Sequence, residues 1–326
     1  MNQLQYIVRD RPNFSRLKEV LNAGLSMSRG LGIENATLFF MQAYTSKYQD
    51  RRSYDLRLEA TYLYENKGSF RDSYFNFEKI KASSFATPSI KVAMDLKTLK
   101  LLKRYGSESD MFKISSRLIQ SSKNLRVLAG AYEIQIKLAK KVKNTAELSR
   151  IEKAIDSIGL AHPDIRETKA LARLSLLENK DLSPLYRPVQ SISLKDPTAH
   201  VKKVFAQFTQ VYRDYMEVCS LSNSGCVVAM TTLMGIAEKT RDTLAEVTIN
   251  SSIDQKVQQS FLSYQKYVVS SLDRMSASAS KAASSVAFNQ GGLPESVQEM
   301  LWFNGKDWNF NPLSWGEGSG FIHWQM

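Results

Sequence analysis

Apolar side chains recur at spacings of three and four residues along most of the chain, whereas runs that alternate apolar and polar residues are rare. A spacing of three and four places apolar side chains on one face of a helix, and alternation is typical of a half-buried strand. No Asn-Gly or Asp-Gly turn joins two alternating runs, which would be the sequence signal of a tight hairpin. The pattern therefore predicts an all-α fold.

Short breaks interrupt the helical pattern at a regular step. One series of breaks is spaced by 37, 39, 38 and 35 residues, at Gly30, Lys67, Gly106, Asn144 and Asn179. A second series lies between them and is spaced by 37, 36 and 40 residues, near Asp50, Thr87, Lys123 and Pro163. Two interleaved series with a period near 37 residues predict helix–turn–helix units stacked in a row, the architecture of an α-solenoid.

Residues 58–85 fit such a unit best, through five residues in order: Tyr64, Gly68, Phe70, Ser73 and Phe77. This stretch resembles a tetratricopeptide repeat, with an aromatic late in its first helix, a glycine and an aromatic at the turn, and a small residue early in its second helix. Three features depart from that pattern: Arg57 stands at the early large position of the first helix, Ser73 stands where alanine is usual, and the closing Pro88 comes a few residues late. The resemblance implies a tetratricopeptide-like solenoid in residues 1–182. An irregular all-helical domain is the alternative.

Residues 183–197 contain three of the eight prolines and show no helical period, so they are predicted to be an elbow between domains. Three long helical patterns follow it, beginning near Pro197, at Cys226 and after Asn250, each about 23–25 residues long. Their matched lengths and short connections predict an antiparallel helical bundle in residues 198–288. The Ser- and Ala-rich residues 276–285 either continue the third helix, as we expect, or form a flexible spacer.

The two cysteines of the chain, Cys219 and Cys226, lie on either side of six residues that we interpret as the turn between the first two bundle helices. Neighbouring antiparallel helices have axes about 8–10 Å apart, so side chains flanking such a turn can reach bonding distance. Their position favours a disulfide, which implies an oxidising compartment such as a bacterial periplasm. Two buried thiols in a reducing cytosol are the alternative.

No transmembrane segment is expected, because the longest apolar stretch, residues 226–237, is well short of the roughly 20 residues that span a bilayer. The first ten residues lack the apolar core of a signal peptide. We therefore expect either a cytoplasmic protein or an exported chain from which the signal has been removed.

The formal charge is +12 and is unevenly distributed, since residues 289–326 hold one lysine against four carboxylates. The densest basic stretch contains Lys123, Arg126, Lys137, Lys140, Lys141 and Lys143. On a helix these residues spread around the cylinder, which is typical of a solvated face; a surface for an anionic partner is the alternative. Aromatic residues are not interleaved with them as binding of single-stranded nucleic acid would require, so nucleic acid is not the expected partner.

The C-terminal segment, residues 289–326, has a composition of its own, with six of the 15 glycines and all four tryptophans. Its aromatic residues are candidates for binding a partner or for capping the helical body: Trp302, Phe303, Trp308, Phe310, Trp315, Phe321 and Trp324. Because large exposed aromatics favour aggregation, and because the segment is acidic and the body basic, we expect it to pack on the chain's own body.

Motifs for catalysis or metal binding are missing from the sequence: there is no Gly-x-Ser-x-Gly elbow, no pair of histidines four residues apart and no Cys/His cluster. We therefore expect no cofactor, no metal and no enzymatic activity. The expected function is a scaffold or adaptor that binds other proteins in a bacterial cell envelope, as a periplasmic protein. The alternatives are a cytoplasmic adaptor or RNA-binding helical-repeat protein and, third, an enzyme with an unrecognised site.

Overall fold

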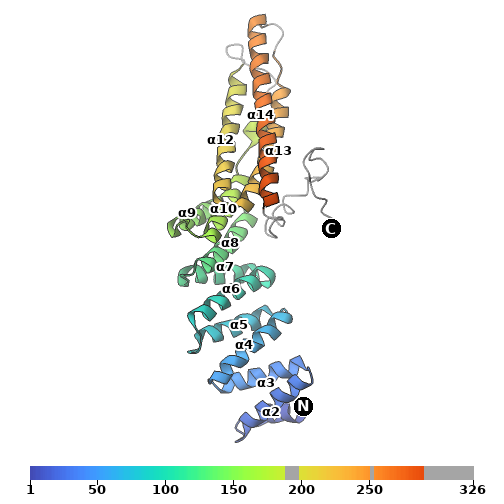
Figure 1. Cartoon of the computed structure of the whole chain (residues 1–326), viewed down its shortest axis with the longest axis vertical. Coiled ribbons are helices and arrows are strands. Elements are labelled where there is room, and N and C mark those ends of the chain that lie inside the picture. Colours follow the sequence, from blue (N-terminus) through green and yellow to red (C-terminus); the bar gives the residue numbers. More distant parts are fainter. Residues whose placement is uncertain (188–197, 250–252, 290–326) are drawn as a thin grey trace. The chain divides into compact units, whose positions relative to one another are not determined.

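A computed structural model describes residues 1–187, 198–249 and 253–289 of the chain, and these residues form fourteen helices and no strand (Figure 1). The all-α expectation is therefore confirmed. None of the described helices is long and apolar enough to cross a membrane. The chain divides into two compact units, Met1–Asn144 and Thr145–Met326.

The first unit consists of eight helices: α1 (Asn2–Asp10), α2 (Leu17–Gly30), α3 (Glu34–Lys47), α4 (Arg51–Asn66), α5 (Phe70–Ala82), α6 (Pro88–Tyr105), α7 (Glu108–Ser121) and α8 (Leu125–Lys141). Each helix packs against the next one in the chain, and α6 also packs against α8. Within this unit the helices thus follow one another in chain order (Figure 1). From α2 to α8 the connections are two to five residues long, and they lie at the breaks that the sequence predicts.

Local capping explains why these helices begin and end where they do. Before α4, the Asp50 carboxylate accepts a hydrogen bond from the Ser53 N–H at 2.9 Å, and Thr87 caps α6 in the same way just ahead of Pro88. A side-chain acceptor at this position satisfies an N–H group that has no partner inside the helix. After α2 and α4, Gly32 and Gly68 adopt a φ of +66°, a left-handed conformation that glycine takes without steric cost.

Apolar side chains of the first unit form a series of clusters along the stack. One cluster joins α1 to α4 around Leu21 and Phe40, a second joins α4 to α6 around Phe77 and Ile80, and a third joins α6 to α8. Phe70, at the start of α5, packs against both the second and the third cluster. Each helix therefore buries its apolar face against its neighbours in the chain.

Ion pairs link alternate helices of this unit, a feature that the sequence did not reveal. Arg29 of α2 pairs with Glu59 of α4, Lys97 of α6 pairs with Glu65 of α4, and Lys103 of α6 pairs with Glu133 of α8. The members of each pair are 30 to 32 residues apart in the sequence. Exposed pairs of this kind each add little stability.

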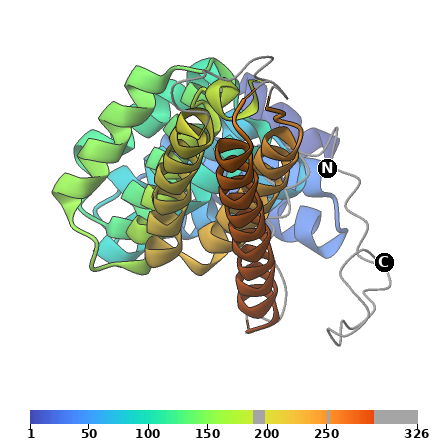
Figure 2. The same ribbon diagram turned by 90° about the horizontal axis from the view of Figure 1, so that it is seen from above.

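The second unit contains α9 (Thr145–Ile158), α10 (Pro163–Glu178), α11 (Ser183–Tyr186), α12 (Ala199–Leu221), α13 (Asn223–Ala245) and α14 (Gln255–Asn289). The last three are long helices that run side by side, as the views in Figures 1 and 2 agree. One apolar cluster holds the unit together and includes Phe208 of α12, Met230 of α13 and Phe261 of α14. Ala170 and Leu174 of α10 belong to the same cluster.

The division of the chain differs from the boundary expected at residues 183–197. Helices α9 and α10 belong to the second unit by their contacts, because α10 buries its apolar face against α12 and α13. The first residues of the expected elbow form the short helix α11, which buries Leu185 in the same cluster. Residues 188–197, which include the expected helix start at Pro197, lie outside the described residues, and α12 begins at Ala199.

In the second unit the turn between α12 and α13 differs from the expectation, whereas the continuation of α14 through the Ser- and Ala-rich stretch agrees with it. The turn between α12 and α13 is one residue long, Ser222, so that Cys219 and Cys226 both lie inside helices. Helix α14 has 35 residues, because the Ser- and Ala-rich stretch continues it. Ser276, Ala279 and Ala283 recur at three and four residues and are buried, so their small side chains allow close packing along the added turns.

Candidate binding site

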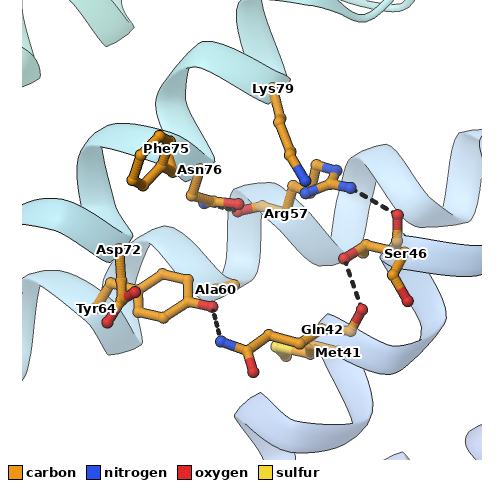
Figure 3. A pocket seen from close by; sticks show the side chains of 11 residues that line it. Met41, Gln42, Ser46, Arg57, Ala60, Tyr64, Asp72, Phe75, Asn76 and Lys79 are labelled. Atoms are coloured by element: carbon orange, nitrogen blue, oxygen red, sulfur yellow. Dashed lines mark hydrogen bonds between the residues drawn. The ribbon is translucent and has the colours of Figure 1, made fainter.

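A pocket of about 250 Å³ opens in the first unit between α3, α4 and α5 (Figure 3). Helix α3 contributes Met41, Gln42, Thr45 and Ser46, α4 contributes Arg57, Ala60 and Tyr64, and α5 contributes Asp72, Phe75, Asn76 and Lys79. The helical spacing of four on α5, from Asp72 through Asn76 and from Phe75 to Lys79, places these side chains on the face beside α4. The pocket therefore depends on three successive helices of the first unit.

The neutral polar side chains of the pocket are engaged within the protein. Asn76 donates its amide N–H groups to the Arg57 carbonyl oxygen at 2.8 Å and to the Thr61 hydroxyl at 3.1 Å. Gln42 donates to the Tyr64 hydroxyl at 2.6 Å, and the hydroxyls of Thr45 and Ser46 donate to carbonyl oxygens of their own helix. These groups form the frame of the pocket and hold α3, α4 and α5 together.

The cations of the pocket have donor capacity left. The Arg57 guanidinium donates one hydrogen bond, from Nη2 to the Thr45 carbonyl oxygen at 2.6 Å. Among the described residues, neither Arg57 nor Lys79 has a carboxylate within ion-pair distance. Figure 3 shows both side chains directed to the same part of the pocket.

Burial adds to the electrostatic character of this site. It lowers the pKa of the half-buried Arg57 guanidinium, because removing the cation from water penalises its charged form. It raises the pKa of the Tyr64 hydroxyl for the corresponding reason. The carboxylate of the pocket, Asp72, accepts a hydrogen bond from the Ser69 hydroxyl at 2.6 Å at the start of α5. The pocket thus offers unsatisfied positive charge beside an exposed aromatic ring, that of Phe75.

Another pocket, of about 300 Å³, lies between α2, α3 and α4 and has a different electrostatic balance. Its arginine, Arg29, donates from Nε to the Glu59 carboxylate at 2.9 Å and also pairs through Nη2. The charge of this guanidinium is therefore already matched by a carboxylate of the protein. The comparison makes Arg57 the more suitable group for an external anion.

The two cysteines named from the sequence are brought together in the second unit. Their Sγ atoms are 2.10 Å apart, at disulfide distance, and join the last turn of α12 to the first turn of α13. Ser222 caps α13 through a hydrogen bond from the Gly225 N–H at 2.9 Å, so the turn is held by the backbone as well.

The basic residues named from the sequence lie on or beside α8. Lys141 pairs with Glu108 of α7, which removes it from the set of unpaired charges. Lys123, Lys137 and Lys143 are exposed and make no ion pair with another described residue. Arg126 and Lys140 lie on the same helix.

The aromatic candidates of the C-terminal segment, Trp302, Phe303, Trp308, Phe310, Trp315, Phe321 and Trp324, lie outside the described residues. Within the described ranges, no group of three or more His, Cys, Asp or Glu side chains is placed to hold a metal ion. Of the three histidines, His162 caps α10, where its Nδ1 accepts a hydrogen bond from the Asp164 N–H at 3.2 Å.

Sequence reasoning did not find the pocket, although one signal for it was present. Arg57, which directly precedes residues 58–85, is one of the residues at which the chain departs from the tetratricopeptide pattern that this stretch resembles. A charged residue at a position that is usually filled by a large core side chain indicates a charge held near the protein interior, which is costly unless the charge is paired.

Comparisons with family models, with curated proteins and with solved structures yield no match to this chain.

Proposed function

We propose that this chain is a non-catalytic helical-repeat scaffold that binds other proteins through the surface of its first unit. The stacking of α2 to α8 in chain order, with a period near 37 residues, supports a tetratricopeptide-like solenoid. Solenoids present long surfaces because each repeat exposes the same positions to solvent.

The observation that carries the proposal is a pair of large, exposed aromatic side chains on α5 and α7, about one repeat length apart in the sequence. Phe75 on α5 is 61% exposed and Phe112 on α7 is 57% exposed, and they are 37 residues apart in the sequence. Large aromatic side chains are enriched among the residues that anchor protein interfaces. Exposed aromatic side chains favour aggregation in water, so two of them on one unit indicate a surface that a partner protein covers.

Site-specific photocrosslinking tests this proposal. The photoreactive analogue p-benzoylphenylalanine would be placed at position 112 or, as the control, at position 267, where Tyr267 of α14 is also 57% exposed. We expect a discrete protein adduct from position 112 in cells that produce the chain, and its loss when Phe75→Ser is added. Equal adduct patterns from both positions, or none from position 112, would contradict the proposal.

We further propose that the scaffold works in an oxidising compartment, as a periplasmic protein does. The sulfur atoms of Cys219 and Cys226 at disulfide distance support this location, because such bonds persist outside reducing cytosols. Alkylation of the chain in intact cells, followed by mass spectrometry, tests it. Two alkylated thiols before any reductant is added would place the chain in a reducing compartment instead.

An RNA-binding repeat protein is the second candidate, and Lys123, Lys137 and Lys143 favour it because they are exposed without ion pairs among the described residues. Binding of RNA through such charges must weaken steeply with salt. A gel shift with single-stranded RNA at about 50 mM salt distinguishes the two candidates. We expect no shift; a shift that is lost when Lys123, Lys137 and Lys143 are all replaced by Gln would favour the RNA-binding protein.

A further inference from the structure

We propose that the pocket between α3, α4 and α5 binds the carboxylate side chain of an acidic segment of a partner protein. This inference rests on the proposed function, since it names the chemistry of a partner that the scaffold would hold. The groups that carry it are Arg57, Lys79 and the ring of Phe75.

The hydrogen-bond inventory of the pocket points to an anion. Both N–H groups of the buried Asn76 amide are used inside the protein, as are the hydroxyl donors of Thr45 and Ser46. The Arg57 guanidinium carries five N–H groups and donates one of them to a protein acceptor, and the Lys79 ammonium donates none to a described residue. The unused donors of the cations therefore exceed those of the neutral groups, and donors on two adjacent cations are satisfied best by an acceptor of negative charge.

The pocket favours a carboxylate over a more highly charged anion. Asp72 contributes a negative charge to the same lining, which opposes a dianionic phosphate more strongly than a singly charged carboxylate. A guanidinium presents its N–H groups in a planar fork that matches the two oxygens of a carboxylate. The exposed Phe75 ring offers an apolar wall for the methylene groups of a glutamate side chain, and a volume of about 250 Å³ suits one side chain better than a whole cofactor.

A titration read at Met41 tests the inference, because this buried residue lines the pocket and its methyl group can be followed by NMR. The probes are the peptide acetyl-Gly-Glu-Gly-amide, the matched acetyl-Gly-Gln-Gly-amide and inorganic phosphate, each added to the full chain. We expect the glutamate peptide to shift the Met41 methyl resonance at a concentration at least tenfold below that needed by the glutamine peptide. Stronger binding of phosphate than of the glutamate peptide would overturn the assignment to a carboxylate.

Matched lysine variants locate the binding. Lys79→Gln and Lys137→Gln remove one charge each from exposed, helical lysines that pair with no described residue, and only Lys79 lines the pocket. We expect Lys79→Gln to weaken the glutamate peptide at least threefold and Lys137→Gln to leave its affinity unchanged. Arg57→Lys keeps the charge and loses the planar fork, so it should weaken the peptide at least threefold as well. Equal effects of Lys79→Gln and Lys137→Gln would show binding to overall charge and overturn the site.

Failure of this inference and failure of the proposed function give different results. If position 112 crosslinks a partner while the glutamate peptide leaves Met41 unshifted, the scaffold stands and the carboxylate site is wrong. If the peptide shifts Met41 in a Lys79-dependent manner while no partner crosslinks, the pocket binds carboxylates and the scaffold proposal is wrong.

Discussion

Lys143, two residues after the end of α8, has a φ of +52° and is the one described residue other than glycine with a positive φ. Its N–H donates to the Lys140 carbonyl oxygen at 3.0 Å, and the Asn144 N–H donates to the Ala139 carbonyl oxygen at 2.9 Å. This pair of bonds is the Schellman arrangement that ends a helix on a left-handed residue. Gly32 occupies the corresponding position after α2 and has a φ of +66°.

We expect Lys143→Gly to stabilise the chain by about 0.5–1 kcal/mol. A left-handed conformation costs a residue with a Cβ atom about 1–2 kcal/mol, and glycine avoids this cost. Glycine also has more freedom in the unfolded chain, which offsets about 0.5–1 kcal/mol of the gain. No other term is large, because the Lys143 side chain is exposed and pairs with no described residue.

Lys137→Gly is the matched control, since it makes the same chemical change on the same helix. Lys137 is exposed in the interior of α8, where glycine is about 1 kcal/mol less favourable than good helix formers. The two variants should therefore move the urea midpoint, followed by circular dichroism at 222 nm, in opposite directions at an unchanged m value. If both variants destabilise the chain equally, the reasoning about the end of α8 is refuted.

Three further substitutions or treatments test other parts of the structure. Ser73→Ala should stabilise the chain by about 1 kcal/mol, because this buried hydroxyl has no hydrogen-bond partner among the described residues and alanine is the better helix former. Ser28→Ala is the control: it loses a hydrogen bond to the Leu25 carbonyl oxygen and should be near neutral in the same urea titration. Burial would raise the pKa of Glu78, but hydrogen bonds from Lys81 and Arg117 lower it, so Glu78→Gln should cost about 1 kcal/mol at pH 7. Because the folded pKa is the lower one, that cost should disappear as the pH falls below about 4.5, and a constant cost from pH 7 to 3 would contradict the assignment. Reduction of the bond between the two cysteines should lower the free energy of unfolding by about 2 kcal/mol, as measured by melting with and without dithiothreitol; identical melting curves for a chain shown by mass spectrometry to be oxidised would contradict this expectation.

Helix boundaries followed from the sequence because they are set by neighbouring residues. Asp50 caps α4 through the Ser53 N–H, and Asn124 caps α8 through the N–H groups of the first turn. Gly68 ends α4 by adopting a φ that other residues avoid. Such signals act over three or four residues, so they can be recognised without knowledge of the fold. The pairing of Cys219 with Cys226 was open to prediction for the same reason, since the two residues are close in the chain.

The length of α14 shows where local signals become ambiguous. Its Ser- and Ala-rich turns have neither strong helical amphipathicity nor a break, and the sequence left a spacer open as an alternative. Burial of Ala279 and Ala283 against the bundle settles the helix, because small side chains contribute stability only when another helix lies close to them. The one-residue turn at Ser222 was likewise shorter than the six residues that composition suggested.

The sequence by itself determined that this chain is helical, where most helices start and stop, and that they recur with a period near 37 residues, because capping and amphipathic spacing are local properties. Only the tertiary structure decided which helices share a core and which charges meet. Arg29 pairs with Glu59, thirty residues away in the sequence, whereas Arg57 has no carboxylate within ion-pair distance among the described residues of a pocket built by three helices. These outcomes depend on how helices pack against each other, and the separation of two residues in the sequence does not show whether packing brings them into contact.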